Sequence, residues 1–209
     1  VRTNQRFPLI LMLHGSGAIG DDNTAQLGAL AMSWADSAVR REFPAYVVVP
    51  QFSERSAYYE VDSTDGLPRS RSGSQLRAAL DLVESLLRVE AIDTSRIYVM
   101  GFSMGASAVW QVLLLRPHTF AGAIAFAGIP PERATASLLM HENIFVLHGD
   151  ADTENPPQAD WAMLAALRRS GGTSALHKEF PGLGHEVPSS FVADISWRRW
   201  LFSQKLKLR

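Results

Sequence analysis

Three short stretches of the chain hold side chains suited to nucleophilic chemistry. The pentapeptide GFSMG is centred on Ser103, HGDAD contains Asp150 and Asp152, and GLGHE contains His185. A serine hydroxyl is a weak nucleophile until a neighbouring histidine takes its proton, and that histidine needs an acid to orient it. The order serine, acid, histidine along this chain therefore predicts a Ser-His-Asp group.

The residues around Ser103 fit the pattern G-x-S-x-G. This pattern marks a sharp turn from a strand into a helix, which holds the serine side chain up at the end of the strand in a strained backbone conformation. The apolar run Ile97–Met100 precedes the turn, and a helical pattern follows it as far as Pro117. We therefore predict that Ser103 is the nucleophile.

The acid is harder to assign from the residues alone. Asp150 and Asp152 both follow the predicted strand Ile144–Leu147, and either could orient the histidine while the other holds the loop by hydrogen bonds. Glu154 is a third acid in the same loop, and we expect it to be solvated.

His185 is the preferred base because it lies in a loop of small residues after the last predicted strand. The other histidines are less well placed: His177 lies within a strand, His118 and His141 lie outside the strand ends, and His148 is expected to brace the acid loop.

A glycine-rich loop follows the first predicted strand. Residues 15–20, GSGAIG, match the G-x-G-x-x-G fingerprint of dinucleotide-binding proteins. Two acids follow the glycines where a helix should receive phosphate, and the second strand does not end in an acid, so a dinucleotide site is disfavoured. The loop instead predicts an oxyanion hole, with the backbone N–H groups of Ser16 and Met104 as donors and Gly17 as an additional or replacement donor.

Short apolar runs alternate with helical patterns, which predicts a three-layer α/β/α sandwich with a mostly parallel sheet of about six or more strands, in one domain spanning 1–209. Ligands of such sheets bind beyond the carboxyl ends of the strands. The expected strands cover 9–13, 46–49, 97–100, 121–127, 144–147 and 175–180, and the expected helices include 24–41 with Asn23 as N-cap, 76–87, 161–167 and 191–205. Residues 51–74 are expected to form a long loop.

Composition narrows the function classes. Apolar residues make up 46% and charged residues 20% of the 209, the net charge is −1, and there are no basic blocks, so nucleic acid is not an expected partner. No apolar stretch is long enough to span a bilayer. The chain has no cysteine, which excludes disulfides and thiolate metal sites and leaves the compartment open; the lack of a signal-like segment favours the cytoplasm.

The sequence resembles the α/β-hydrolase superfamily. Four segments carry this resemblance: LHGSG, GFSMG, HGDAD followed by Pro156, and GLGHE. More narrowly, it resembles the small carboxylesterase/phospholipase/thioesterase and dienelactone-hydrolase-like branch. The resemblance implies that the acid is Asp152, the last residue of the H-G-x-x-D segment. Similar dienelactone hydrolases commonly carry cysteine where this chain has Ser103, so ordinary ester hydrolysis is favoured.

Together these features predict a serine esterase that needs no cofactor or metal and acts on small or medium esters. A thioesterase, a peptidase-like hydrolase, an acyltransferase or a non-catalytic binding protein would share the same fold. Arg69 or Arg71 in the expected long loop could meet a substrate carboxylate, and Tyr58 and Tyr59 lie nearby in it. The tryptophans Trp34, Trp110 and Trp161 are expected in the core or the pocket wall.

Overall fold

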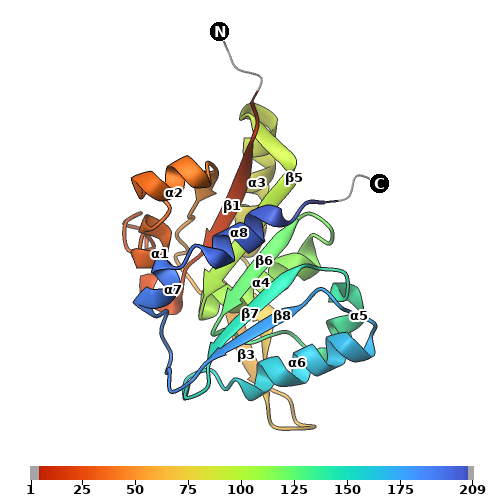
Figure 1. Cartoon of the computed structure of the whole chain (residues 1–209). Coiled ribbons are helices and arrows are strands. Elements are labelled where there is room, and N and C mark those ends of the chain that lie inside the picture. Colours follow the sequence, from red (N-terminus) through yellow and green to blue (C-terminus); the bar gives the residue numbers. More distant parts are fainter. Residues whose placement is uncertain (1–4, 207–209) are drawn as a thin grey trace.

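A six-stranded parallel sheet forms the centre of the computed structural model, which describes residues 5–206 (Figure 1). The strand order is β2-β1-β5-β6-β7-β8, and every neighbouring pair is parallel. These strands are β1 (Phe7–Leu13), β2 (Tyr46–Val48), β5 (Ile92–Phe102), β6 (Gly122–Phe126), β7 (Ile144–Gly149) and β8 (Leu176–Phe180). The α/β fold and the six predicted strands are confirmed.

The chain reverses its direction of travel across the sheet between β1 and β5. From β1 it moves outward to β2, and it then returns to the other side of β1 and continues from β5 to β8. The loops that follow β1 and β5 therefore diverge at one point, and such switch points are where parallel sheets bind ligands.

Helices cover both faces of the sheet, which gives three layers (Figure 1). One face packs against α3 (Leu76–Val89), α4 (Met104–Leu115), α5 (Ala136–Leu139) and α6 (Gln158–Arg169). The other face packs against α1 (Ala29–Met32), α2 (Ser37–Glu42), α7 (Ser189–Ala193) and α8 (Ser196–Ser203). Two short 3-10 turns, η1 (Ser16–Ala18) and η2 (Arg133–Thr135), complete the helical elements of the described chain.

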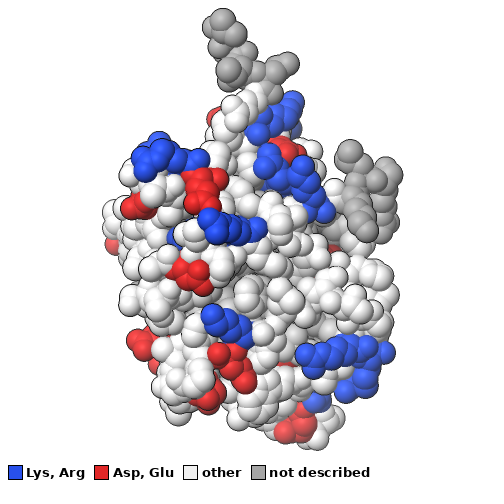
Figure 2. Space-filling view, in the orientation of Figure 1, with Lys and Arg blue, Asp and Glu red and all other residues white. Residues whose placement is uncertain are grey.

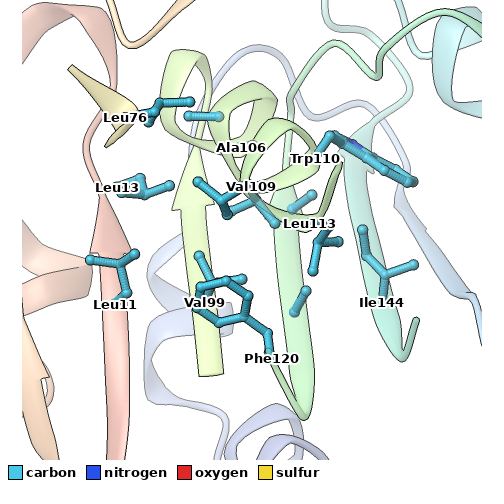
Figure 3. Close-up of a cluster of buried hydrophobic side chains, with 14 of the residues drawn as sticks. Leu11, Leu13, Leu76, Val99, Ala106, Val109, Trp110, Leu113, Phe120 and Ile144 are labelled. Carbon is cyan, nitrogen blue, oxygen red and sulfur yellow. The ribbon is translucent and has the colours of Figure 1, made fainter. Parts of the chain in front are cut away.

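Helix α4 is central to the first of these cores. Its residues from Met104 to Leu113 are all buried, and Figure 3 shows Val109, Trp110 and Leu113 packed between the helix and the sheet. A helix that is apolar on nearly all sides belongs in a protein interior. This burial on both sides holds the helix, and hence the Ser103 turn that precedes it, in a fixed position.

The expected helix over 24–41 is wrong. The chain forms α1 and α2 instead, and Asn23 does not cap a helix, because its backbone is left-handed with φ of 54°. Asp22 accepts the N–H groups of Thr24 and Ala25 in a local turn, and Asp36 caps α2. These side-chain hydrogen bonds compete with a continuous helix.

The expected loop at 51–74 is also wrong. It contains an antiparallel hairpin of β3 (Ala57–Val61) and β4 (Pro68–Ser72), which packs against α4. Its strands lack an apolar run because they are largely exposed, so the hydrophobic pattern gives little signal. The expected helix over 191–205 is divided into α7 and α8, where Asp194 accepts the N–H of Ser196.

The surface shows no concentration of one charge on the face drawn in Figure 2, where Lys and Arg are interspersed with Asp and Glu. No helix within residues 5–206 is long and apolar enough to cross a membrane.

Candidate active site

Ser103 lies on a strained turn between β5 and α4. Its φ of 57° and ψ of −124° are unusual for a residue other than glycine, and its N–H donates to Phe126 O at 2.9 Å. A Cβ on Gly101 would lie 2.4 Å from the backbone of Gly105, and a Cβ on Gly105 would lie 1.9 Å from Leu13 O. Both glycines are therefore required by close backbone packing around the serine.

His185 joins Ser103 to Asp152. The Nε2 atom of His185 lies 2.8 Å from Ser103 Oγ, and its Nδ1 atom lies 2.7 Å from Asp152 Oδ2. The Asp152 side chain is fully buried, whereas the His185 side chain is 11% exposed. The structure thus brings the three residues predicted from the sequence into one continuous hydrogen-bonded chain.

Two loops hold the acid and the histidine in place. Ala151 N–H donates to Leu183 O, and Asp150 Oδ1 accepts the N–H of Gly182. A Cβ on Gly149 would lie 2.1 Å from Leu183 O, so the loops approach closely where they meet. Asp150 therefore fastens the two loops together, and Asp152 is the aspartate bonded to His185.

The environment of Asp152 favours its ionised form. Burial raises the pKa of this carboxyl, but the hydrogen bond from His185 and the N–H groups of Asn155 and Glu154 outweigh burial and hold the pKa below its ordinary value. Glu154 is largely exposed, and its carboxylate lies 3.8 Å from His185 Nε2.

The glycine-rich loop after β1 lies beside Ser103. A Cβ on Gly15 would come 3.5 Å from the Cβ of Ser103. Ser16 begins η1 and Met104 begins α4, so neither residue's N–H group has an acceptor within its own helix. Both predicted oxyanion donors therefore belong to helix starts next to the serine.

His14 holds this loop, a role that the sequence analysis missed. Its Nε2 lies 2.9 Å from the N–H of Phe52 and accepts from it, so Nδ1 carries the proton and donates to Gly15 O at 2.8 Å. Burial lowers the pKa of His14 and favours this neutral tautomer. Because a peptide unit is planar and trans, fixing Gly15 O also fixes the direction of the Ser16 N–H. The signal in the sequence was the place of His14 directly between the apolar run 9–13 and the glycine-rich loop.

An apolar pocket opens next to His185. Its volume is about 340 Å³, and its lining includes Gly15, Phe102 and His185. Small and apolar residues form most of the wall: Ala18, Ala25, Gly28, Ala29, Leu30, Ala31, Val49, Val187 and Val192. The lining contains Glu186 and, among residues 5–206, no lysine or arginine.

Several side chains considered for the site are occupied elsewhere. Arg69 pairs with Glu60 at 2.6 Å, and Arg71 pairs with the other oxygen of the same carboxylate at 2.6 Å. Trp34 and Trp110 are buried in the core as expected, but Trp161 is 44% exposed, so that expectation is wrong for Trp161. It lies on the outer side of α6, where its indole N–H donates to the Glu179 carboxylate.

The remaining histidines do not contact Ser103 in the described structure. His177 lies in β8 as predicted, and His118 pairs loosely with Glu142. His148 is fully buried and contacts the acid loop, as predicted. Within residues 5–206 no cluster of three or more acidic or histidine side chains is arranged to hold a metal ion.

The fold is that of an α/β-hydrolase. Residues 2–197 match the model of the phospholipase/carboxylesterase family, and the chain belongs to that family. The resemblance noted in the sequence is confirmed at this level.

Two curated relatives cover most of the chain. It is 28% identical over 208 residues to "Probable carboxylesterase Os04g0669600" of Oryza sativa subsp. japonica, which covers 92% of this chain and 86% of the relative. It is 24% identical over 196 residues to "Acyl-protein thioesterase 1" of Eremothecium gossypii, which covers 88% of this chain and 83% of the relative.

Solved structures support the same fold. A thermostable esterase superposes with a TM-score of 0.83 at 26% identity over 98% of this chain, and the chain spans 56% of that esterase. Arabidopsis thaliana SOBER1 superposes with a TM-score of 0.64 at 22% identity over 94% of this chain and 99% of SOBER1, which shows likeness of fold alone.

Proposed function

We propose that this chain is a serine hydrolase that cleaves carboxylic esters through an acyl-enzyme intermediate. The observation that carries the proposal is the chain of hydrogen bonds from Ser103 through His185 to buried Asp152, together with the apolar pocket that His185 lines. Both curated relatives carry names of hydrolases, a carboxylesterase and a thioesterase.

The geometry supports the following reaction. His185 Nε2 takes the proton of Ser103 as its oxygen attacks the substrate carbonyl, and Asp152 keeps Nδ1 protonated and stabilises the imidazolium. The protonated histidine then donates to the leaving alcohol, and water hydrolyses the acyl-enzyme by the same route. The N–H groups of Ser16 and Met104 hold the oxyanion, each worth about 3 to 4 kcal/mol by analogy with a measured oxyanion donor.

The pocket supports an apolar, uncharged group of small or medium size on one side of the scissile bond. Its apolar wall would bury such a group, whereas a carboxylate or phosphate would meet Glu186 without a compensating cation in the lining. Glu154 adds a second carboxylate near His185. Neutral esters are therefore the favoured substrates, and polyanionic ones are disfavoured.

A thioesterase is the second candidate, because the relative from Eremothecium gossypii carries that name and the acyl-enzyme chemistry is shared. Parallel assays with an oxygen ester and a thioester of the same acyl group distinguish an esterase from a thioesterase, because the preferred substrate has the higher kcat/KM.

The test compares hydrolysis of p-nitrophenyl acetate, butyrate and octanoate at pH 8 by the wild type and by Ser103→Ala. We expect turnover by the wild type and a loss of about 10⁶-fold in kcat in the variant, as when such a nucleophile is removed elsewhere. A folded wild type without turnover on any of these esters, or a variant with wild-type turnover, would refute a serine esterase.

A further inference from the structure

A second histidine contacts the same carboxylate that orients His185. His148, near the end of β7, is fully buried, and its Nε2 lies 3.2 Å from Asp152 Oδ2 and 2.9 Å from Asn155 O. Its Nδ1 lies 2.6 Å from Oδ2 of Asp160, a residue of α6 that is 1% exposed. The hydrogen-bonded chain from Ser103 thus continues beyond Asp152 to a second histidine and a second aspartate.

The acceptors around His148 define where its protons are. A backbone carbonyl only accepts, so Nε2 must carry a hydrogen to bond Asn155 O. On the other side of the ring, one proton lies between Nδ1 and the Asp160 carboxyl. If that proton belongs to the imidazole, His148 is a cation between two carboxylates.

The charges around the ring favour the cation, whereas burial of Asp160 raises the pKa of that carboxyl and acts against its ionised form. Burial lowers the pKa of His148, but Asp160, the Asn155 carbonyl and the charge of Asp152 outweigh burial and raise it above its ordinary value. Two further titratable groups belong to β8. Glu179 lies opposite His148 in the strand register and accepts from Trp161, and His177 is close enough to influence Asp160.

We propose that His148 and Asp160 form a buried ion pair that tunes how strongly Asp152 supports the protonated form of His185. This inference rests on the proposed hydrolase function. His148 is a positioning residue, since it acts on the reaction only through Asp152. Its positive charge faces Asp152, whereas Asp160 bonds the far side of the ring. The pair therefore partly offsets the negative charge that Asp152 presents to His185.

The variant Asp160→Asn tests this effect while keeping the shape of the side chain. The amide N–H of the new asparagine can donate to Nδ1, so the His148 ring becomes neutral and its Nε2 hydrogen bonds remain. Asp152 then presents more negative charge, and His185 holds its proton more strongly. The acidic limb of kcat/KM against pH should shift upward by about half a pH unit, which is the order expected for a partly compensated charge at an effective dielectric of about 20.

The measured quantity is kcat/KM for p-nitrophenyl butyrate from pH 5 to pH 9. On the acidic limb Asp160→Asn should be roughly threefold slower than the wild type, with the plateau within about twofold. Asp93→Asn is the matched control, because it removes an equal charge near the amino-terminal end of β5, where Asp93 pairs with Arg96, and its profile should not shift. An unshifted limb in folded Asp160→Asn, or a shift to lower pH, overturns the proposal.

A spectroscopic measurement decides the ion pair independently of turnover. In wild type labelled with ¹⁵N-histidine, both ring nitrogens of His148 should give N–H signals at pH 8, and one should become unprotonated in Asp160→Asn. His148→Gln assigns the signals. One unprotonated His148 nitrogen in the wild type would place the proton on Asp160 and overturn the proposal. If Ser103→Ala keeps its activity, the hydrolase function fails, while these spectra still decide the charge of His148.

Discussion

The close approach of the two site loops leads to a specific prediction for Gly149→Ala. Gly149 lies three residues before Asp152, and Leu183 lies two residues before His185. A methyl group at position 149 would lie 2.1 Å from Leu183 O and 2.7 Å from Gly184 O. Both contacts are with backbone atoms, so a rotamer change cannot relieve them.

The size of the effect follows from the displacement. The loops must separate by about 1.3 Å for the contact to lengthen from 2.1 Å to an ordinary 3.4 Å. The hydrogen bonds of His185 are 2.7 and 2.8 Å long, so a shift of this size at either loop takes them beyond useful length. A misplacement of about 1 Å costs roughly 100-fold in rate, or about 2.7 kcal/mol of transition-state stabilisation.

The assay is hydrolysis of p-nitrophenyl butyrate by wild type, Gly149→Ala and Gly184→Ala, with thermal denaturation to show that each variant is folded. Gly184 is the matched control because it precedes His185 directly, yet an added Cβ there meets no atom within 4 Å. We expect kcat/KM to fall roughly 100-fold in Gly149→Ala and to stay within about threefold of wild type in Gly184→Ala. A folded Gly149→Ala that keeps more than a third of wild-type kcat/KM, or a Gly184→Ala control that loses as much as Gly149→Ala, would contradict this prediction.

Two further predictions concern the pocket and its neighbouring turn. Gly28→Phe places a ring in the apolar pocket, because Gly28 lines this pocket and an added Cβ there meets no atom within 4 Å. We expect kcat/KM for p-nitrophenyl octanoate to fall at least tenfold relative to that for the acetate in Gly28→Phe, and the wild-type ratio to be kept in Gly28→Ala. Equal ratios in all three proteins would place the acyl group elsewhere. The N–H groups of Ala25 and Thr24 lower the pKa of Asp22 to about 2, below the ordinary value of 3.8. The ionised Asp22 carboxylate should therefore make its full contribution to the free energy of unfolding above pH 3.8 and lose that contribution as the pH falls through about 2. Carboxyl ¹³C NMR across pH 1.5 to 5 measures this titration, and a midpoint near 3.8 would contradict the turn geometry.

The sequence alone determined the elements with strong local signals. The continuous apolar runs that became β1, β6 and β7 can be read directly because strands buried on both faces leave no polar alternation. The glycines around Ser103 also predicted the turn correctly, because a strand-to-helix turn with backbone packed closely around it leaves no room for a side chain at those positions.

Local patterns failed where exposed polar residues form structure or interrupt it. The hairpin of β3 and β4 has little apolar content, and its pairing exists because it packs on α4. The breaks between α1 and α2 and between α7 and α8 depend on carboxylates that accept backbone N–H groups. Each of these hydrogen bonds contributes little free energy, and the sequence pattern does not show where such a bond interrupts a helix and where the helix continues.

The residues of the candidate site were predicted partly from the sequence, and the tertiary structure shows how they are arranged. Residue types and chain order determined a serine, an acid and a histidine, but Asp150 and Asp152 stayed equivalent until the resemblance favoured one of them. The tertiary structure separates them: Asp150 bonds Gly182, and Asp152 bonds His185. It also shows that buried His14 is bonded to Phe52 and that buried Asp160 is bonded to His148, contacts between residues distant in sequence. Hydrogen bonds between loops depend on how strands and helices pack, and only the folded chain brings these atoms within 3 Å of one another.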